Sequence, residues 1–147
     1  MRKFRTIVPV LALVALGALL IVALPTGYLV GFLRFNVRWE STGYQFGRLF
    51  GLTVFVGLPE ELLFRGLLQE ALSRWWGARR GWLAASLLFG LTHIVKHAPP
   101  PNWRYALLAT IAGLAYGWVY QRTRRLSAAA LLHGLVDWIW GTFLLVG

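Results

Sequence analysis

The chain has no cysteine among its 147 residues and only five acidic side chains. The absence of cysteine excludes disulfide bonds, thiol nucleophiles and thiolate metal sites. Acidic residues are so scarce that the adjacent pair Glu60 and Glu61 stands out. In contrast, 58% of the residues are hydrophobic and the mean hydropathy is +0.61, well above an ordinary soluble domain. The composition therefore indicates an integral membrane protein.

Positive charge is abundant: 15 Lys and Arg residues give a formal net charge of +10. A basic chain can bind nucleic acid, but here the basic residues lie in small clusters between apolar runs. This distribution is typical of loops that face anionic lipid. We therefore expect membrane lipid as a partner and no nucleic acid.

Five apolar segments are long enough to cross about 30 Å of hydrocarbon, at residues 6–33, 44–72, 81–97, 103–120 and 126–146. Charges and the run Pro99-Pro100-Pro101 separate them and stop a helix. The sequence thus predicts an all-α, polytopic transmembrane bundle of about five helices. We divide it into an N-terminal helix and loop (1–43) and a helical core (44–147), within a single membrane domain.

The first segment follows the basic start MRKFR, which is also how a signal peptide begins. Residues 6–33 carry no charge, however, and no small-x-small cleavage site follows, so we expect a retained transmembrane helix. Clusters rich in arginine alternate with sparser ones along the chain. The positive-inside rule then places the N-terminus inside and the C-terminus outside. We expect the membrane to be the cytoplasmic membrane of a prokaryote.

The second segment is too long for one straight crossing and contains Gly57 and Pro59. Proline lacks the amide that a continuous helix needs, so a kink or a new helix start is expected there. Acidic residues are favoured at a helix N-terminus. That placement alone could explain Glu60 and Glu61 without any catalytic role.

Other ionisable residues lie at similar depth in later segments. A rise of about 1.5 Å per residue puts Glu60 roughly 21 Å from Arg74, His93 roughly 20 Å from Arg80 and Asp137 roughly 18 Å from Arg125. His133, at roughly 12 Å, is shallower. Ionisable groups at this depth are costly and normally face a cavity or each other, so they predict a polar intramembrane cavity with a function.

Spacing within each segment suggests partners. Glu61 and Arg65 are four residues apart, so Arg65 can neutralise Glu61, while Glu60 is rotated about 100° away and left for another partner. Phe89 lies four residues before His93 and can pack against its ring.

A carboxylate beside an imidazole in a mostly dry cavity can activate water as a general base. Glu60 and His93 supply these two groups. His133 could donate to the oxyanion of a cleaved amide, and Asp137, four residues later, could orient His133 or a substrate group. The residues therefore suggest a hydrolase whose nucleophile is water.

Three motifs at these positions resemble the CPBP family of intramembrane proteases, also called Abi or CAAX-processing proteases. They are Glu60-Glu61-x-x-x-Arg65, Phe89-x-x-x-His93 and His133-x-x-x-Asp137, in the family's order and on separate segments. The resemblance spans roughly residues 50 to 147.

The resemblance implies an intramembrane endopeptidase that acts in peptide or protein maturation and needs no cofactor. Glu60 and His93 would activate water, and His133 and Asp137 would form the oxyanion side. Glu61, Arg65 and Phe89 would support the site. The chain is shorter than the eukaryotic prenyl-protein enzymes and has Asp137 where they tend to have Asn, which argues against a prenylated substrate.

Three alternatives remain open. His93, His97, His133 and Glu60 could hold zinc, although the H-E-x-x-H spacing is absent. A non-catalytic protein, such as an immunity or scaffold protein, could use the same residues to bind a peptide. A small transporter could use the polar layer as a proton relay, although no internal repeat is evident. The sequence leaves the substrate and the oligomeric state open.

Overall fold

The computed structural model describes residues 2–96 and 99–146. Helices dominate it, with two short strands. The elements in chain order are α1 (Arg2–Leu29), β1 (Leu33–Phe35), α2 (Thr42–Gly51), η1 (Leu52–Gly57), α3 (Leu58–Glu61), η2 (Leu62–Gln69), α4 (Glu70–Trp76), α5 (Ala78–Leu91), α6 (Trp103–Thr123), α7 (Leu126–Phe143) and β2 (Leu144–Val146).

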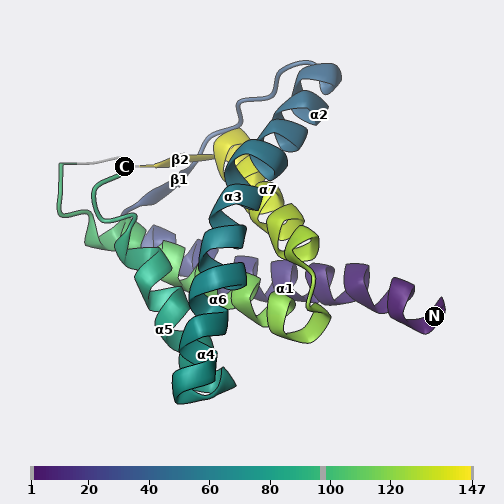
Figure 1. Ribbon diagram of the computed structural model, residues 1–147. Helices are drawn as coiled ribbons and strands as arrows, with labels where there is room; N and C mark the ends of the chain where they lie inside the picture. Colours follow the sequence, from purple (N-terminus) through teal and green to yellow (C-terminus); the bar gives the residue numbers. More distant parts are fainter. Residues whose placement is uncertain (1, 97–98, 147) are drawn as a thin grey trace.

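The elements from α2 to α4 form one long helix, which Figure 1 shows as a continuous rod. Residues at the joints keep helical dihedral angles, for example φ −59° and ψ −50° at Gly57 and φ −61° and ψ −46° at Leu62. The segments η1 and η2 are π-helical, which widens the backbone on either side of Pro59. The rod and the helices α1, α5, α6 and α7 confirm the predicted all-α bundle of five helices.

The prediction of a new helix start at Pro59 is wrong. The helix begins at Thr42, where the Ser41 side chain accepts a hydrogen bond from the Tyr44 amide. Glu60 and Glu61 therefore lie well inside the long helix rather than at its N-terminus. The helix dipole does not account for these two acids.

The third helix is shorter than predicted, because α5 ends at Leu91 rather than near residue 97. In a continuing helix the Phe89 carbonyl would accept from the amide of His93. Instead it accepts from the Thr92 hydroxyl at 2.7 Å and pairs with His93 Nδ1 at 2.9 Å. Residues 92–96 form turns. The other predicted bounds shift by a few residues.

Two three-residue strands were not predicted. β1 and β2 pair antiparallel, with Arg34 opposite Leu145, and so join the segment after α1 to the segment after α7. Beyond β1, the amides of Asn36 and Arg38 donate to the carbonyls of Phe143 and Thr142. This pairing ends α7 at Phe143, short of the predicted residue 146.

Helix α1 packs against α6 and α7, behind the long helix in the view of Figure 1. Its outward side is apolar, with Leu13 65%, Ile21 76% and Leu29 87% exposed. The stretch Ile7–Leu29 has a mean hydropathy of 3.0 and, among the described helices, is the one long and apolar enough to cross a membrane. Membrane crossing by the other four helices stays a prediction.

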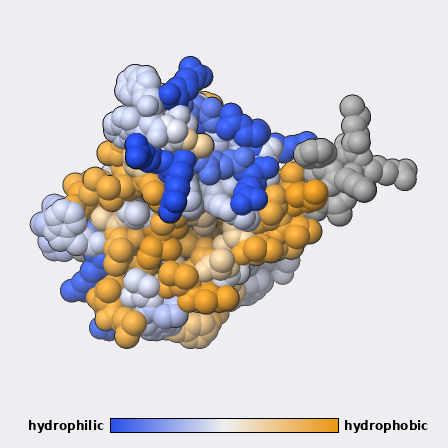
Figure 2. Space-filling model, turned by 90° about the horizontal axis from the view of Figure 1, so that it is seen from below, coloured by the Kyte–Doolittle hydropathy of each residue, from blue (hydrophilic) through white to orange (hydrophobic). Residues whose placement is uncertain are grey.

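Apolar side chains also cover much of the face seen in Figure 2, with hydrophilic side chains gathered in one part of it. The core contains aromatic residues, such as Phe89 on α5 and Tyr116 on α6, and small residues, such as Ala112 on α6 and Ala129 on α7. Small residues let helix backbones approach closely. Charged side chains can then reach backbone carbonyls of the neighbouring helix.

Candidate active site

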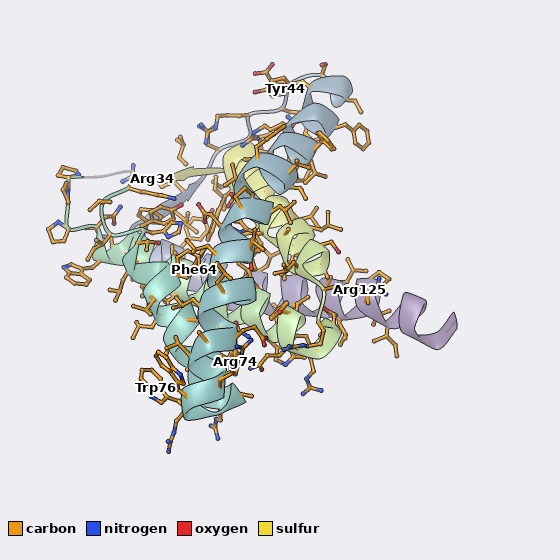
Figure 3. The ribbon with its side chains drawn as sticks, viewed as in Figure 1. Arg34, Tyr44, Phe64, Arg74, Trp76 and Arg125 are labelled. Carbon is orange, nitrogen blue, oxygen red and sulfur yellow. The ribbon has the colours of Figure 1, made fainter. Side chains whose placement is uncertain are left out.

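The candidate site lies halfway along the long helix. Figure 3 shows Phe64 near the middle of this helix, Tyr44 toward one end, and Arg74 and Trp76 at the other. Phe64 lies between Glu61 and Arg65 in sequence. Glu61 and Arg65 are therefore far from both ends of the long helix.

The two adjacent glutamates occupy different environments. Glu61 is fully buried, with Oε2 at 3.1 Å from Arg65 Nε and Oε1 at 2.9 Å from His133 Nδ1. The Glu60 side chain is 27% exposed, and its Oε2 lies 3.9 Å from His133 Nε2. Successive helical residues point about 100° apart, so one carboxylate faces the packed interior and the other an open side.

Arg65 is completely buried although it carries a charge. Besides pairing with Glu61, it donates through Nη2 to the Gly113 carbonyl at 2.8 Å. Its Cζ atom lies 4.7 Å from the Phe89 ring centroid and 5.5 Å from that of Tyr116, within the range of cation–π attraction. The predicted Glu61–Arg65 pair is therefore present, and its arginine packs against residues of α5 and α6.

Glycine at position 113 makes this approach possible. A Cβ atom there would lie 3.3 Å from Arg65 Nη2 and 3.2 Å from the Phe89 ring. One helical turn further, Gln69 Nε2 donates to the Gly117 carbonyl at 3.3 Å. Two polar side chains of the long helix are thus anchored on the backbone of α6.

His133 joins both glutamates to α7. Because a carboxylate accepts hydrogen bonds, the contact with Glu61 places a proton on His133 Nδ1. The ring stacks on Tyr116, with centroids 4.7 Å apart and an angle of 16° between the planes. Its other nitrogen, Nε2, lies 3.5 Å from Asp137 Oδ2 and faces Glu60.

His93 lies in the turn after α5. Its Nδ1 is 2.9 Å from the Phe89 carbonyl, which can only accept, so Nδ1 carries the proton and Nε2 has a lone pair that can accept a hydrogen bond. The ring packs against Phe89 and Tyr105, with centroids 4.7 Å and 5.0 Å away. The predicted contact between Phe89 and His93 is therefore present.

Lys96 is the residue that sequence reasoning missed. Its Nζ lies 3.3 Å from His93 Nε2 and 3.7 Å from Glu60 Oε1, so it stands between the predicted base and its imidazole partner. In the sequence, Lys96 lies at the end of the predicted segment 81–97, which gave no reason to place it beside Glu60. The signal that could have revealed its contact with His93 is that the two residues are three positions apart in the sequence.

The zinc alternative gains no geometric support. Among the residues that the structure describes, no three His, Asp or Glu side chains are arranged to hold a metal ion. His97, which that alternative invoked as a ligand, lies outside the described residues.

The fold and the site together define an all-α protein of five helices in which two glutamates of the long helix, a histidine after α5, and a histidine and an aspartate of α7 form the candidate site. A family model described as type II CAAX prenyl endopeptidase Rce1-like matches residues 42–139. This match covers more than half of the chain, so the protein belongs to the Rce1-like family, whose members are membrane proteins. Searches of curated proteins and of solved structures found no match.

Proposed function

We propose that the protein is an intramembrane endopeptidase in which Glu60 and His93 activate a water molecule. The observation that carries this proposal is the contrast between the two glutamates. Glu61 is closed in by Arg65 and His133, while Glu60 is partly exposed and close to the same histidine. Only a carboxylate on the open side can reach water and a substrate.

In the proposed reaction, water lies between the Glu60 carboxylate and His93 Nε2. The tautomer of His93 leaves Nε2 as an acceptor, which can orient the water through one of its hydrogens when the Lys96 ammonium moves away from Nε2. As the water oxygen bonds to the substrate carbonyl carbon, Glu60 takes the proton. Glu60 then gives this proton to the amide nitrogen as the carbon–nitrogen bond breaks, so that an amine and a carboxylic acid are released.

His133 is the proposed donor to the oxyanion. Glu61 binds Nδ1 and fixes the ring plane together with Tyr116, which leaves Nε2 directed at the open side. Because Nδ1 already donates to Glu61, donation from Nε2 requires the imidazolium form of His133, and the Asp137 carboxylate next to Nε2 stabilises this positive charge until the oxyanion forms. Glu61 and Arg65 hold His133 and do not touch the substrate.

A membrane-tethered peptide or protein is the proposed substrate, cleaved during maturation in a prokaryotic cytoplasmic membrane. The family description names prenyl endopeptidases, so prenylated peptides belong in the first test beside acylated ones. The lipid-facing apolar side of α1 is compatible with a substrate that arrives within the bilayer.

The test compares purified wild-type protein with Glu60→Gln against a pool of acylated and prenylated peptides, with products identified by mass spectrometry. Glutamine cannot take the proton, so we expect kcat/KM to fall by about 10²–10⁴-fold, with unchanged thermal unfolding in detergent. Glu40→Gln, which changes an exposed acid elsewhere, should behave as wild type.

Three results would contradict the proposal. If Glu60→Gln cleaves at the wild-type rate, Glu60 is not the base. Cleavage that a chelator abolishes would point to the metal alternative. Binding of the peptides without cleavage by wild type would favour a non-catalytic peptide-binding protein.

A further inference from the structure

An apolar groove of about 400 Å³ is formed by α1, α6 and the start of α5. Val14, Ala18 and Val22 line it from α1, Trp82 from α5 and Trp118 from α6. None of its lining residues is charged, and none belongs to the candidate site. Because α1 is long and apolar enough to cross a membrane, we expect the groove to open toward lipid.

The groove is elongated along the helix axes. Ile111 and Trp118 are the first and last lining residues on α6, and seven residues of helix span about 10 Å. Helix α1 runs antiparallel to α6, since Arg104 Nη1 near the start of α6 donates to the Gly31 carbonyl after the end of α1. A hydrocarbon chain that lies parallel to these helices fits this shape.

Positive charge is held at one end of the groove. The Cζ atom of Arg122 lies 5.4 Å from the centroid of the Trp118 ring, within the range of cation–π attraction. Arg122 is one helical turn beyond Trp118 and is exposed. The lining tryptophan therefore keeps a guanidinium close to the end of the apolar groove.

A second arginine lies at the same end. Arg79 precedes Trp82 by three residues, so both are on the same side of α5. Gln121 Nε2 donates to the Ala78 carbonyl at 2.8 Å, which joins the start of α5 to the end of α6. Arg79 and Arg122 therefore lie beyond the same end of the groove.

Acidic residues do not offset this charge. Glu70 is the one acid between residues 62 and 136, and both of its oxygens accept from Arg124, at 2.6 and 3.0 Å. The sequence predicts this arginine-rich end on the inner side of the membrane, where the leaflet contains anionic lipid. A guanidinium binds phosphate through two parallel hydrogen bonds.

We propose that this groove is a binding site for an anionic phospholipid, with an acyl chain along α1 and α6 and the phosphate held by Arg122 and Arg79. A helix from a second copy of this chain fits less well. Its apolar helix α1 carries three basic residues and no acid, so it would bring no anion to the arginines. The inference does not rest on the proposed function.

The test compares phosphatidylglycerol with phosphatidylcholine of the same acyl chains, added to the purified full-length protein in detergent. Native mass spectrometry measures the dissociation constant of the bound lipid. We expect wild type to bind phosphatidylglycerol at least about tenfold more tightly, and Arg122→Gln to lose about fivefold of this preference, the scale of one arginine near a lipid headgroup. Arg34→Gln removes the same charge from an exposed position of β1 and should keep the full preference.

A second variant tests the acyl chain. Ala18→Phe places a large ring in the groove from an exposed position of α1, so both lipids should bind more weakly. Leu13→Phe is the matched control, because Leu13 is 65% exposed on α1 and does not line the groove. Thermal unfolding checks that all variants fold.

Three results would overturn the proposal. The first is equal binding of the two lipids by wild type, or an unchanged preference in both Arg122→Gln and Arg79→Gln. The second is full competition by glycerol phosphate, which would mean that the arginines bind a free phosphate ester without the groove. The third is a dimer in nanodiscs that Ala18→Phe dissociates, which would assign the groove to a second copy. Because no readout needs peptide cleavage, the proposed function can fail while this inference stands.

Discussion

Two halves of the site are built from similar residues but differ in burial. The support network consists of Glu61, Arg65 and Gln69, closed against α6 and α7. The open side consists of Glu60 and Lys96, which are 27% and 44% exposed in their side chains, together with His93. The two neighbouring glutamates thus have different environments, because a rotation of one residue along the helix turns the side chain from a packed interface to an open side.

This difference in burial determines how much a substitution on each side should lower the free energy of unfolding. Removing one partner of a buried ion pair leaves the other charge buried without a partner, which lowers the free energy of unfolding by roughly 3–5 kcal/mol. Exposed ion pairs contribute only about 0–1 kcal/mol, because water screens them. Changes in the support network should therefore affect folding, and changes on the open side should affect the reaction.

The largest expected effect is that of Arg65→Met. It leaves Glu61 buried without its cation and removes the bond to the Gly113 carbonyl. We expect the free energy of unfolding to fall by about 3–5 kcal/mol, measured by thermal or denaturant unfolding in detergent. Arg79→Met, at an exposed position of α5, should unfold as wild type does. A fully stable Arg65→Met protein would show that the network does not hold the helices together.

An intermediate effect is expected for Gly117→Ala. The added Cβ would lie 2.5 Å from the Trp82 ring and 2.7 Å from Gln69 Oε1, so one of these side chains must move. Such overpacking costs about 1–3 kcal/mol, visible as a lower unfolding midpoint.

The matched control is Gly47→Ala in α2, where nothing lies within 4 Å of the new Cβ. Alanine favours a helix over glycine by about 1 kcal/mol, so this variant should be slightly more stable than wild type. Equal unfolding midpoints for both alanine variants would mean that the contact between the long helix and α6 tolerates extra volume.

The smallest effect on stability is expected for Lys96→Met. Its ion pair with Glu60 is partly exposed, so the free energy of unfolding should change by less than about 1 kcal/mol. Activity should rise, because the ammonium no longer occupies the His93 lone pair that the water needs. The measurement is kcat/KM on a cleaved peptide. A fall in kcat/KM with unchanged folding would instead make Lys96 part of the catalytic group.

The sequence predicted those parts of the site that depend on local spacing. Glu61 and Arg65 are four residues apart on one helix, so their pairing follows from helix geometry. The bond between Glu61 and His133 spans 72 residues and depends on how α7 crosses the long helix, which no local pattern reveals. Lys96 was missed because His93 was expected within a helix, whereas the turn after Leu91 brings Lys96 back over the site.

The fold was likewise predicted where it depends on local sequence patterns and missed elsewhere. Long apolar segments were enough to predict five helices, but β1 and β2 are three residues each and carry no recognisable strand pattern. Pro59 was expected to interrupt its helix. Instead, π-helical segments precede and follow the short stretch that contains it, and the helix continues.

The spacing of Glu61 and Arg65 has a consequence for biosynthesis. During translation the long helix is made before α7, so Glu61 reaches the membrane without His133. Arg65 follows within one helical turn and neutralises it, so we expect the predicted membrane segment to insert at a lower cost than one with a lone carboxylate. Because His133 and Asp137 lie later in the chain on α7, the proposed active site is complete only after that helix has been made.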